Sequence, residues 1–147
     1  MQRRTLRHND RRRGFTLIEV LLVLAILGVI AAMLVPSLLR RQKQALIDQT
    51  KINIKALEGI LRQYGLDHDG DMPTTAQGLE VLIVAPNNDD KWKGPYITET
   101  KTLPADAWGR PFQYEFPPTH HSGGDVPDIS SGGPDKTFGT ADDVTNW

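Results

Sequence analysis

The feature that most restricts the fold of this chain is an apolar run of 25 residues, from Phe15 to Leu39, with Glu19 as its one charge. An α-helix needs about 20 apolar residues to cross the hydrocarbon core of a bilayer. The run therefore predicts a transmembrane helix. A carboxylate at the centre of such a helix costs on the order of 3 kcal/mol. Glu19 lies nearer one end, where the cost is smaller, but it still requires a cationic partner.

The charges around this run are distributed unevenly. Residues 1–14 contain six arginines and one aspartate, whereas the remaining residues include eleven basic and seventeen acidic ones, a net charge of −6. A basic flank before an apolar helix is retained in the cytoplasm. This predicts a single-pass membrane protein with its N-terminus in the cytoplasm and its C-terminal domain on the other side of the membrane. A short basic arm beside a membrane anchor makes a poor nucleic-acid-binding module, so no nucleic-acid partner is expected.

Two simpler explanations of the N-terminus are open at this point. A secretory signal peptide has a shorter apolar core than this one, and residues 29–32 offer only a weak small-residue cleavage site. An ordinary signal anchor fits the length of the run but gives Glu19 no role.

Helical periodicity continues beyond the apolar run. The next segment carries an apolar stripe typical of an amphipathic helix, formed by Ile47, Ile54, Leu57, Leu61 and Tyr64. Gly65 is expected to end it. Residues 15–39 and 40–65 are therefore predicted to form one helix about 75 Å long. Pro36 removes a backbone donor inside this helix and is expected to introduce a kink.

Residues 66–147 are predicted to form a small globular domain. A short helix is expected over residues 76–84, and alternating aromatic and polar side chains at 111–116 predict a strand. Residues 126–130 are a weaker candidate for its partner, whereas the segment from Ser130 onward is too polar to suggest a core of its own. The predicted fold class is α+β, a long helix packed on a small antiparallel sheet.

The C-terminal segment has the composition of a cation-binding loop. Asp135, Asp142 and Asp143 lie among glycines, which allow a loop to curl so that carbonyls and distant carboxylates point inward. Calcium takes six to eight oxygen ligands of this kind. The chain has no cysteine, so no disulfide can stabilise an exported domain. This favours a structural calcium ion over a solvated acidic loop.

A second acidic segment is interpreted differently. Asp67, Asp69 and Asp71 match the first ligand positions of an EF-hand. However, Met72 and Gly78 stand where that motif requires its glycine and its bidentate glutamate. The segment is therefore interpreted as a solvated turn.

The remaining chemistry-bearing residues predict no active site. His120 and His121 form a possible transition-metal pair, but no further ligand has suitable spacing, so they are assigned to a surface loop. The sequence contains no nucleophile elbow, phosphate-binding glycine loop or zinc-protease helix. No enzymatic activity is expected.

The start of the apolar run resembles a known processing motif. Arg13-Gly14-Phe15-Thr16-Leu17-Ile18-Glu19 is similar to the motif of type IV pilin-like precursors. In these precursors a prepilin peptidase cuts after the glycine, and the phenylalanine becomes an N-methylated first residue. The resemblance implies that residues 1–14 are a cleaved leader, that Gly14 directs processing, and that Phe15 is methylated. It also implies that Glu19 is the assembly contact.

Most of the chain is similar to the major pseudopilins of type II secretion systems. The similar segments are residues 72–79, 94–96, 106–114 and 135–147. Ala107 departs from the proline that is frequent in this family, and the loop from His120 to Pro127 has no counterpart in its pattern. The family's calcium site lies in the C-terminal loop, which implies calcium ligands at Asp135 and Asp142.

The resemblance implies a structural role in secretion. Such subunits assemble through their N-terminal helices into a helical periplasmic filament with minor pseudopilins, on an inner-membrane platform driven by a cytoplasmic ATPase. The filament helps to move folded proteins through an outer-membrane secretin. Two alternatives stay open. The first is a type IV pilin for adhesion or motility, a class in which disulfide bonds commonly close the C-terminal loop. The second is a membrane-anchored periplasmic calcium-binding or hydrolytic domain, in which the Gly14–Phe15 bond would stay uncut.

Overall fold

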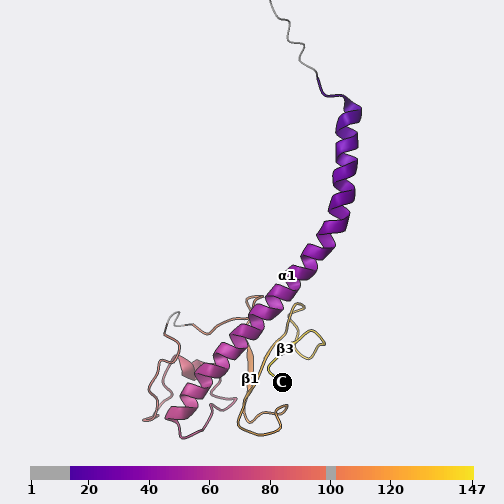
Figure 1. Cartoon of the computed structure of the whole chain (residues 1–147). Helices are drawn as coiled ribbons and strands as arrows, with labels where there is room; N and C mark the ends of the chain where they lie inside the picture. Colours follow the sequence, from indigo (N-terminus) through magenta and orange to yellow (C-terminus); the bar gives the residue numbers. More distant parts are fainter. Residues whose placement is uncertain (1–13, 99–101) are drawn as a thin grey trace, which may run out of the picture. The chain divides into compact units, whose positions relative to one another are not determined.

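The computed structural model describes residues 14–98 and 102–147. The described elements are helix α1 (Leu17–Asp67), the 3₁₀ helix η1 (Leu79–Leu82) and strands β1 (Gln113–Glu115), β2 (Asp128–Ser131) and β3 (Val144–Thr145) (Figure 1). The chain divides into two compact units after Arg40, and α1 contributes to both. The arginines of the predicted leader lie outside the described residues.

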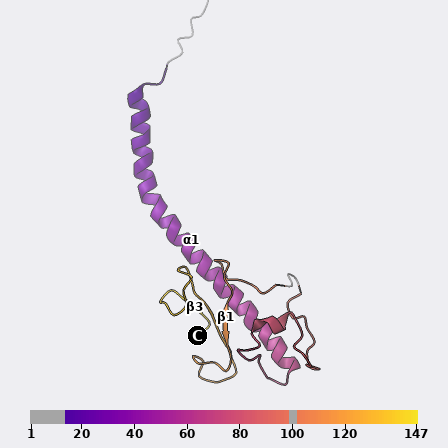
Figure 2. The same ribbon diagram turned by 180° about the vertical axis from the view of Figure 1, so that it is seen from behind.

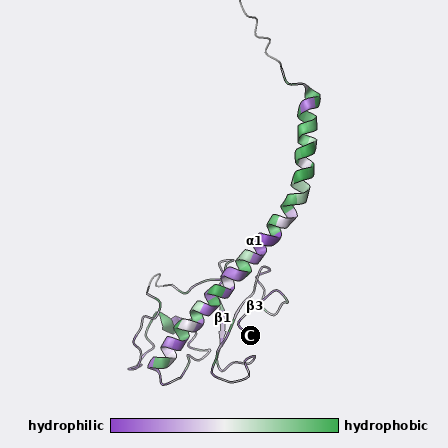
Figure 3. Cartoon of the chain, in the orientation of Figure 1, coloured by the Kyte–Doolittle hydropathy of each residue, from purple (hydrophilic) through white to green (hydrophobic). Residues whose placement is uncertain are grey.

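The first unit consists mainly of the apolar part of α1. Thr16 precedes the helix, and both its carbonyl and its hydroxyl accept a hydrogen bond from the Glu19 amide, at 3.1 and 3.3 Å. This is the contact of a helix N-cap. In Figure 3 most of the ribbon of this segment has the colour of hydrophobic residues, and none of its most apolar stretch is buried in the protein. By length and composition, this segment is the one helix in the described chain suited to cross a membrane.

The helix continues without interruption through Pro36. Proline cannot donate to the carbonyl four residues earlier, so one rung of the helical ladder is missing here. The Ser37 hydroxyl donates to the Leu34 carbonyl at 2.8 Å, within the same turn. A local kink at Pro36 stays a prediction.

The second unit is built on the other half of α1. Ile54, Leu57, Leu61 and Tyr64 are buried along one helical face, as the apolar stripe predicted. Thr50 lies on the same face and is fully buried, because its hydroxyl donates to the Leu46 carbonyl at 2.9 Å and accepts from the Ala107 amide at 3.2 Å. A polar residue with both partners satisfied is stable in a core.

The helix ends slightly later than predicted. Gly65 was expected to stop it, but α1 continues to Asp67, and Gly65 is buried in its last turn. The Gly65 carbonyl accepts hydrogen bonds from the amides of His68 and Gly70, at 3.1 and 2.8 Å. These bonds close the helix end.

A three-stranded antiparallel sheet packs with α1 in this unit (Figures 1 and 2). Its order is β1-β2-β3, with Tyr114 opposite Ile129 and Ser131 opposite Val144. The buried side chains of the sheet join those of α1 and η1 in one hydrophobic core, together with Ile97 and Phe112. The α+β prediction is therefore confirmed, with a long apolar helix and a small sheet.

The C-terminal segment contributes more to the core than its polarity suggested. All four residues of β2 are buried, and Val144 of β3 belongs to the core. The segment from Ser130 onward thus joins the core built on α1, and its buried polar groups find partners. The Ser131 hydroxyl donates to Asp106 Oδ2 at 2.6 Å, while Asp106 Oδ1 accepts the amides of Trp108 and Arg110.

The helix predicted over residues 76–84 is shorter than expected. Residues 74–78 form a hydrogen-bonded turn, in which the amides of Gln77 and Gly78 both donate to the Thr74 carbonyl at 3.0 Å. Gly78 then has φ = 66°, a left-handed conformation that interrupts a right-handed helix and suits glycine. Only the 3₁₀ helix η1 follows it.

The acidic turn after α1 is held by charge pairs. Lys93 and the Tyr96 hydroxyl both donate to the Asp67 carboxylate at 3.0 Å, and Lys91 contacts Asp69 at 2.7 Å. The Lys93 ammonium lowers the pKa of Asp67, and Lys91 does the same for Asp69. These two carboxylates have protein partners, which supports the interpretation of this segment as a turn.

We expect Tyr114→Phe to destabilise the soluble unit of residues 41–147 by about 1–3 kcal/mol, because the buried Pro73 carbonyl would lose its partner. The Tyr114 hydroxyl donates to that carbonyl at 2.7 Å, and burial raises the pKa of the phenol. Tyr64→Phe is the matched control, because the Tyr64 hydroxyl donates no hydrogen bond within the described residues. Urea unfolding measures both; equal losses would contradict the role assigned to this bond.

Candidate functional site

The bond between Gly14 and Phe15 lies in an accessible, non-helical segment. Both residues precede the first helical residue, Leu17, and both are exposed. Phe15 is 82% exposed, and a side-chain carbon placed at Gly14 would meet no atom within 4 Å. A protease that must bind an extended backbone therefore has access to this bond.

Glu19 lies in the first turn of α1 and is exposed. A carboxylate here interacts favourably with the partial positive charge of the helix N-terminus. Glu19 has no ion-pair partner among the described residues. Phe15 lies four residues before it, a spacing at which two side chains or end groups of a helix become neighbours.

The C-terminal acidic loop is closed by its own hydrogen bonds. The Thr140 hydroxyl donates to Asp142 Oδ1 at 2.8 Å and lies 3.2 Å from Asp143 Oδ1, so these two carboxylates face a common point. Asp143 Oδ2 also accepts the Gly139 amide at 2.7 Å. Asp135 instead accepts the amide of Thr137 at 2.8 Å, in a separate turn.

The loop therefore gathers two of the three predicted ligands. Asp142 and Asp143 converge on Thr140. Asp135 is farther away, and the three carboxylates do not form a group with all ligand oxygens within 4.8 Å of one another. Gly133 connects the turns because it has φ = 60°, and any side chain there would collide with the Asp142 carbonyl oxygen. The donors in the loop are carboxylate, hydroxyl and carbonyl oxygens, a set that suits calcium rather than a softer metal.

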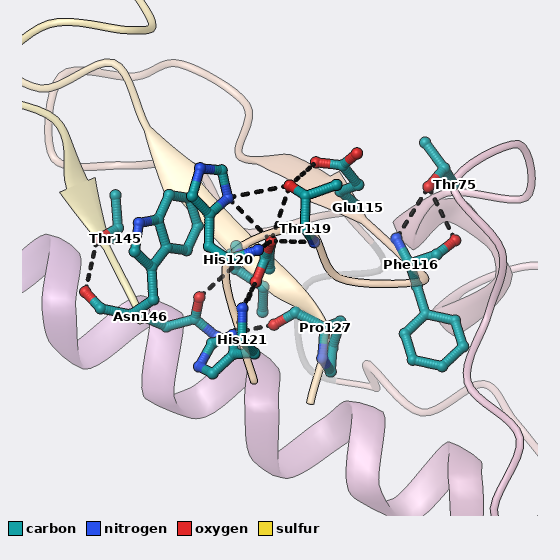
Figure 4. A network of polar contacts seen from close by, with 12 residues as sticks. Thr75, Glu115, Phe116, Thr119, His120, His121, Pro127, Thr145 and Asn146 are labelled. Carbon is teal, nitrogen blue, oxygen red and sulfur yellow. Dashed lines mark hydrogen bonds and ion pairs between the residues drawn. The ribbon is translucent and has the colours of Figure 1, made fainter. Parts of the chain in front are cut away.

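A second cluster surrounds the buried carboxylate of Asp128 (Figure 4). Its Oδ2 accepts the amides of Thr119 and His120, both at 2.8 Å, and lies 3.0 Å from His120 Nδ1. Its Oδ1 lies 2.7 Å from His121 Nδ1. Burial alone would raise the pKa of Asp128, but the hydrogen bonds donated by residues 119–121 hold it well below its usual range.

The prediction of a plain surface loop at His120 and His121 is therefore incomplete. Both rings fold back onto Asp128, and His120 also stacks on Trp147 with ring centroids 4.2 Å apart. Within the described residues, Glu115, His120 and Asp128 are the one group of three whose ligand atoms all lie within 4.8 Å of one another. Sequence spacing could not reveal this group, because β1 and β2 bring together residues from both sides of a long loop.

Two family models match the chain. The model described as prokaryotic N-terminal methylation motif matches residues 9–35, and the model described as type II secretion system (T2SS), protein G matches residues 37–147. The second match covers most of the chain. The chain belongs to this family.

Curated members of the protein G family align with nearly the whole chain. The type II secretion system core protein G of Escherichia coli K12 is 40% identical over 97% of this chain and 95% of its own length. The core protein G of Pseudomonas aeruginosa is 39% identical over 100% and 99%, respectively. This agreement confirms the resemblance to pseudopilins noted in the sequence.

A solved structure supports the same assignment. The crystal structure of the major pseudopilin from the type 2 secretion system of enterohaemorrhagic Escherichia coli matches with a TM-score of 0.61 and 33% identity. The match covers 76% of this chain and 95% of that one. The fold of this protein G family member is therefore type IV pilin-like. Its apolar helix and its methylation motif together indicate a membrane-anchored pseudopilin.

Proposed function

We propose that this chain is a structural, non-enzymatic subunit of the pseudopilus that helps move folded proteins through the outer membrane in type II secretion. The observation that carries this proposal is the apolar first part of α1, whose most apolar stretch is not buried and which the methylation motif overlaps. Its one carboxylate, Glu19, has no ion-pair partner among the described residues. A helix that exposes apolar side chains on every side requires lipid or other helices around it.

Processing converts the anchor into an assembly element. A prepilin peptidase cuts between Gly14 and Phe15, removes the basic leader, and leaves a positive α-amino group on Phe15. Before assembly, this amine and the Glu19 carboxylate neutralise each other partly within one helix. In the filament, Glu19 pairs with the amine of an adjacent subunit, because an unpaired charge inside a helix bundle is costly.

The remaining partners follow from this role. The leader lies in the cytoplasm and the unit from residue 41 onward in the periplasm, as the basic flank predicts. The filament contains many copies of this chain together with minor pseudopilins. It grows from an inner-membrane platform toward the secretin.

A secretion assay in the source bacterium tests the proposed function. Deleting the gene is expected to leave type II substrates in the periplasm, and expression of the intact chain is expected to restore their release. Normal secretion without the gene would contradict a role in this system. Loss of surface adhesion or motility with normal secretion would instead indicate a type IV pilin.

The proposal includes a structural calcium ion in the C-terminal loop. Asp135, Asp142 and Asp143 would supply carboxylate oxygens, and the ion would offset two of the three negative charges that otherwise repel one another. Support comes from the all-oxygen donor set and from the convergence of Asp142 and Asp143 on Thr140. The ion would hold the separate turn around Asp135 against the rest of the loop.

Removing calcium is expected to lower the melting temperature of residues 41–147 by roughly 10 °C, since a ligand at 100 times its Kd stabilises by about 2.7 kcal/mol. Asp135→Asn should abolish this sensitivity to chelator. Asp90→Asn is the control, because Asp90 is an exposed carboxylate outside the loop. Differential scanning calorimetry with and without chelator measures the shift, and a melting curve indifferent to chelator would exclude the calcium site.

A further inference from the structure

The cluster around Asp128 contains a like-charge pair that the proposed function does not explain. Glu115 in β1 lies directly opposite Asp128 in β2. Like charges in directly opposite positions of antiparallel strands are destabilising. The buried Asp128 carboxylate is fixed in place by hydrogen bonds from the amides of Thr119 and His120, both at 2.8 Å. A cation bound beside the pair would offset the repulsion.

Four ligand-type atoms meet beside this pair. The Thr119 hydroxyl lies 3.2 Å from Glu115 Oε2, 3.1 Å from His120 Nδ1 and 3.4 Å from Asp128 Oδ2. His120 Nδ1 and Asp128 Oδ2 are 3.0 Å apart. Figure 4 shows the Thr119 hydroxyl, the Glu115 carboxylate and the His120 ring directed toward one another.

These separations resemble the edges of a small tetrahedron. Four ligands about 2.0 Å from a central ion, as around zinc, are about 3.3 Å from one another. Four of the six separations are 3.0 to 3.4 Å, on both sides of that value. The other two, which join Glu115 to His120 and to Asp128, are within 4.8 Å. The Thr119 hydroxyl carries a single proton but faces two carboxylates, so it cannot donate to both at once.

The surroundings of the cluster allow a cation to enter. It borders an open hollow of about 390 Å³, whose lining includes Glu115, Asp128 and Asp143 but no lysine or arginine among the described residues. The His120 ring is held in place by stacking on Trp147, with an angle of 8° between the ring planes. An oriented imidazole between two carboxylates, at the edge of an acidic hollow, is a suitable entry site for a divalent ion.

We propose that Glu115, His120 and Asp128 bind a divalent transition-metal ion of the zinc class, with the Thr119 hydroxyl or a water as the fourth ligand. One imidazole nitrogen and two carboxylate oxygens suit zinc better than calcium, which prefers oxygen donors alone. The ion replaces the contact between His120 Nδ1 and Asp128 Oδ2, and His120 binds as neutral imidazole with its proton on Nε2. None of these three ligands belongs to the proposed calcium set, although Asp143 of that set lines the same hollow.

The test is a calorimetric titration of Zn²⁺ into the full-length chain, purified without an affinity tag in detergent micelles and saturated with Ca²⁺. Glu115→Gln and His120→Gln are each expected to weaken zinc binding at least ~10-fold, whereas Asp125→Asn changes it less than ~2-fold. Asp125 is the matched control. It is an exposed carboxylate of the same loop and lies outside the group formed by Glu115, His120 and Asp128.

The fluorescence of Trp147 provides a second readout of zinc binding that is independent of calorimetry. Because its ring stacks on His120, zinc is expected to change tryptophan emission in the wild type, and Trp147→Phe should remove that change while retaining the heat of binding. Three results would overturn the proposal. These are no zinc binding by the wild type, unchanged binding by His120→Gln, or equal losses in His120→Gln and Asp125→Asn.

Discussion

Glu19→Ala is expected to abolish filament assembly while the chain remains in the membrane. The substitution makes the apolar helix more hydrophobic, so insertion does not suffer. It also leaves the α-amino group of Phe15 without its partner inside the helix bundle. Removing one member of a buried ion pair costs about 3–5 kcal/mol, and a loss of that size weakens each subunit contact at least ~100-fold.

Sedimentation of sheared filaments measures assembly, and carbonate extraction of membranes measures insertion. Leu22→Ala is the control, since Leu22 is an exposed apolar residue of the same segment and carries no charge. Glu19→Asp should retain part of the assembly, because it keeps the carboxylate but shortens its reach. Filaments formed by Glu19→Ala at the wild-type yield would exclude the proposed ion pair.

Gly14→Val is expected to leave the precursor uncut, a complete loss of processing. The structure indicates that this substitution would impair cleavage by the peptidase and would not impair folding. A side chain at Gly14 meets no atom within 4 Å, and the residue precedes the helix. The substituted precursor should therefore fold and insert normally but keep its leader. It should also fail to assemble, because no α-amino group is released on Phe15.

Intact mass spectrometry of the membrane fraction measures this cleavage. Gly28→Ala is a suitable control, because Gly28 has equally open surroundings but lies inside the helix, away from the scissile bond. Detection of the mass of the cleaved protein in cells that express Gly14→Val would show that Gly14 does not determine processing. The two variants thus fail at different steps, since Glu19→Ala should be processed fully and Gly14→Val should not.

The long helix could be predicted from sequence because its information is local. Apolar residues spaced by three and four positions predict the buried face that Ile54, Leu57 and Leu61 form. Thr50 lies on the same face and escaped the pattern. Its burial depends on the Ala107 amide, 57 residues away, and no local pattern contains that information.

The sheet and the two candidate metal-binding clusters depend on contacts between residues that are far apart in the sequence. Ser131 enters the core because Asp106 accepts its hydroxyl proton, and Asp128 meets His120 because a loop folds back on the sheet. The composition of residues 135–143 did predict an all-oxygen loop. It could not predict that Asp142 and Asp143 converge on Thr140 while Asp135 remains in its own turn.

The contacts of Asn146 impose an order on how this protein matures. Its side chain accepts the Ile129 amide at 2.9 Å and donates to Glu58 at 2.8 Å, and so joins β2 to a helix residue 88 positions earlier. The face of α1 that bears Leu57 therefore has no complete cover until residues up to 146 have been synthesised and exported. During that interval the nascent subunit is a membrane-tethered helix with an uncovered apolar stripe. Contacts this distant in sequence form late and slowly, so this part of the core is expected to be completed last.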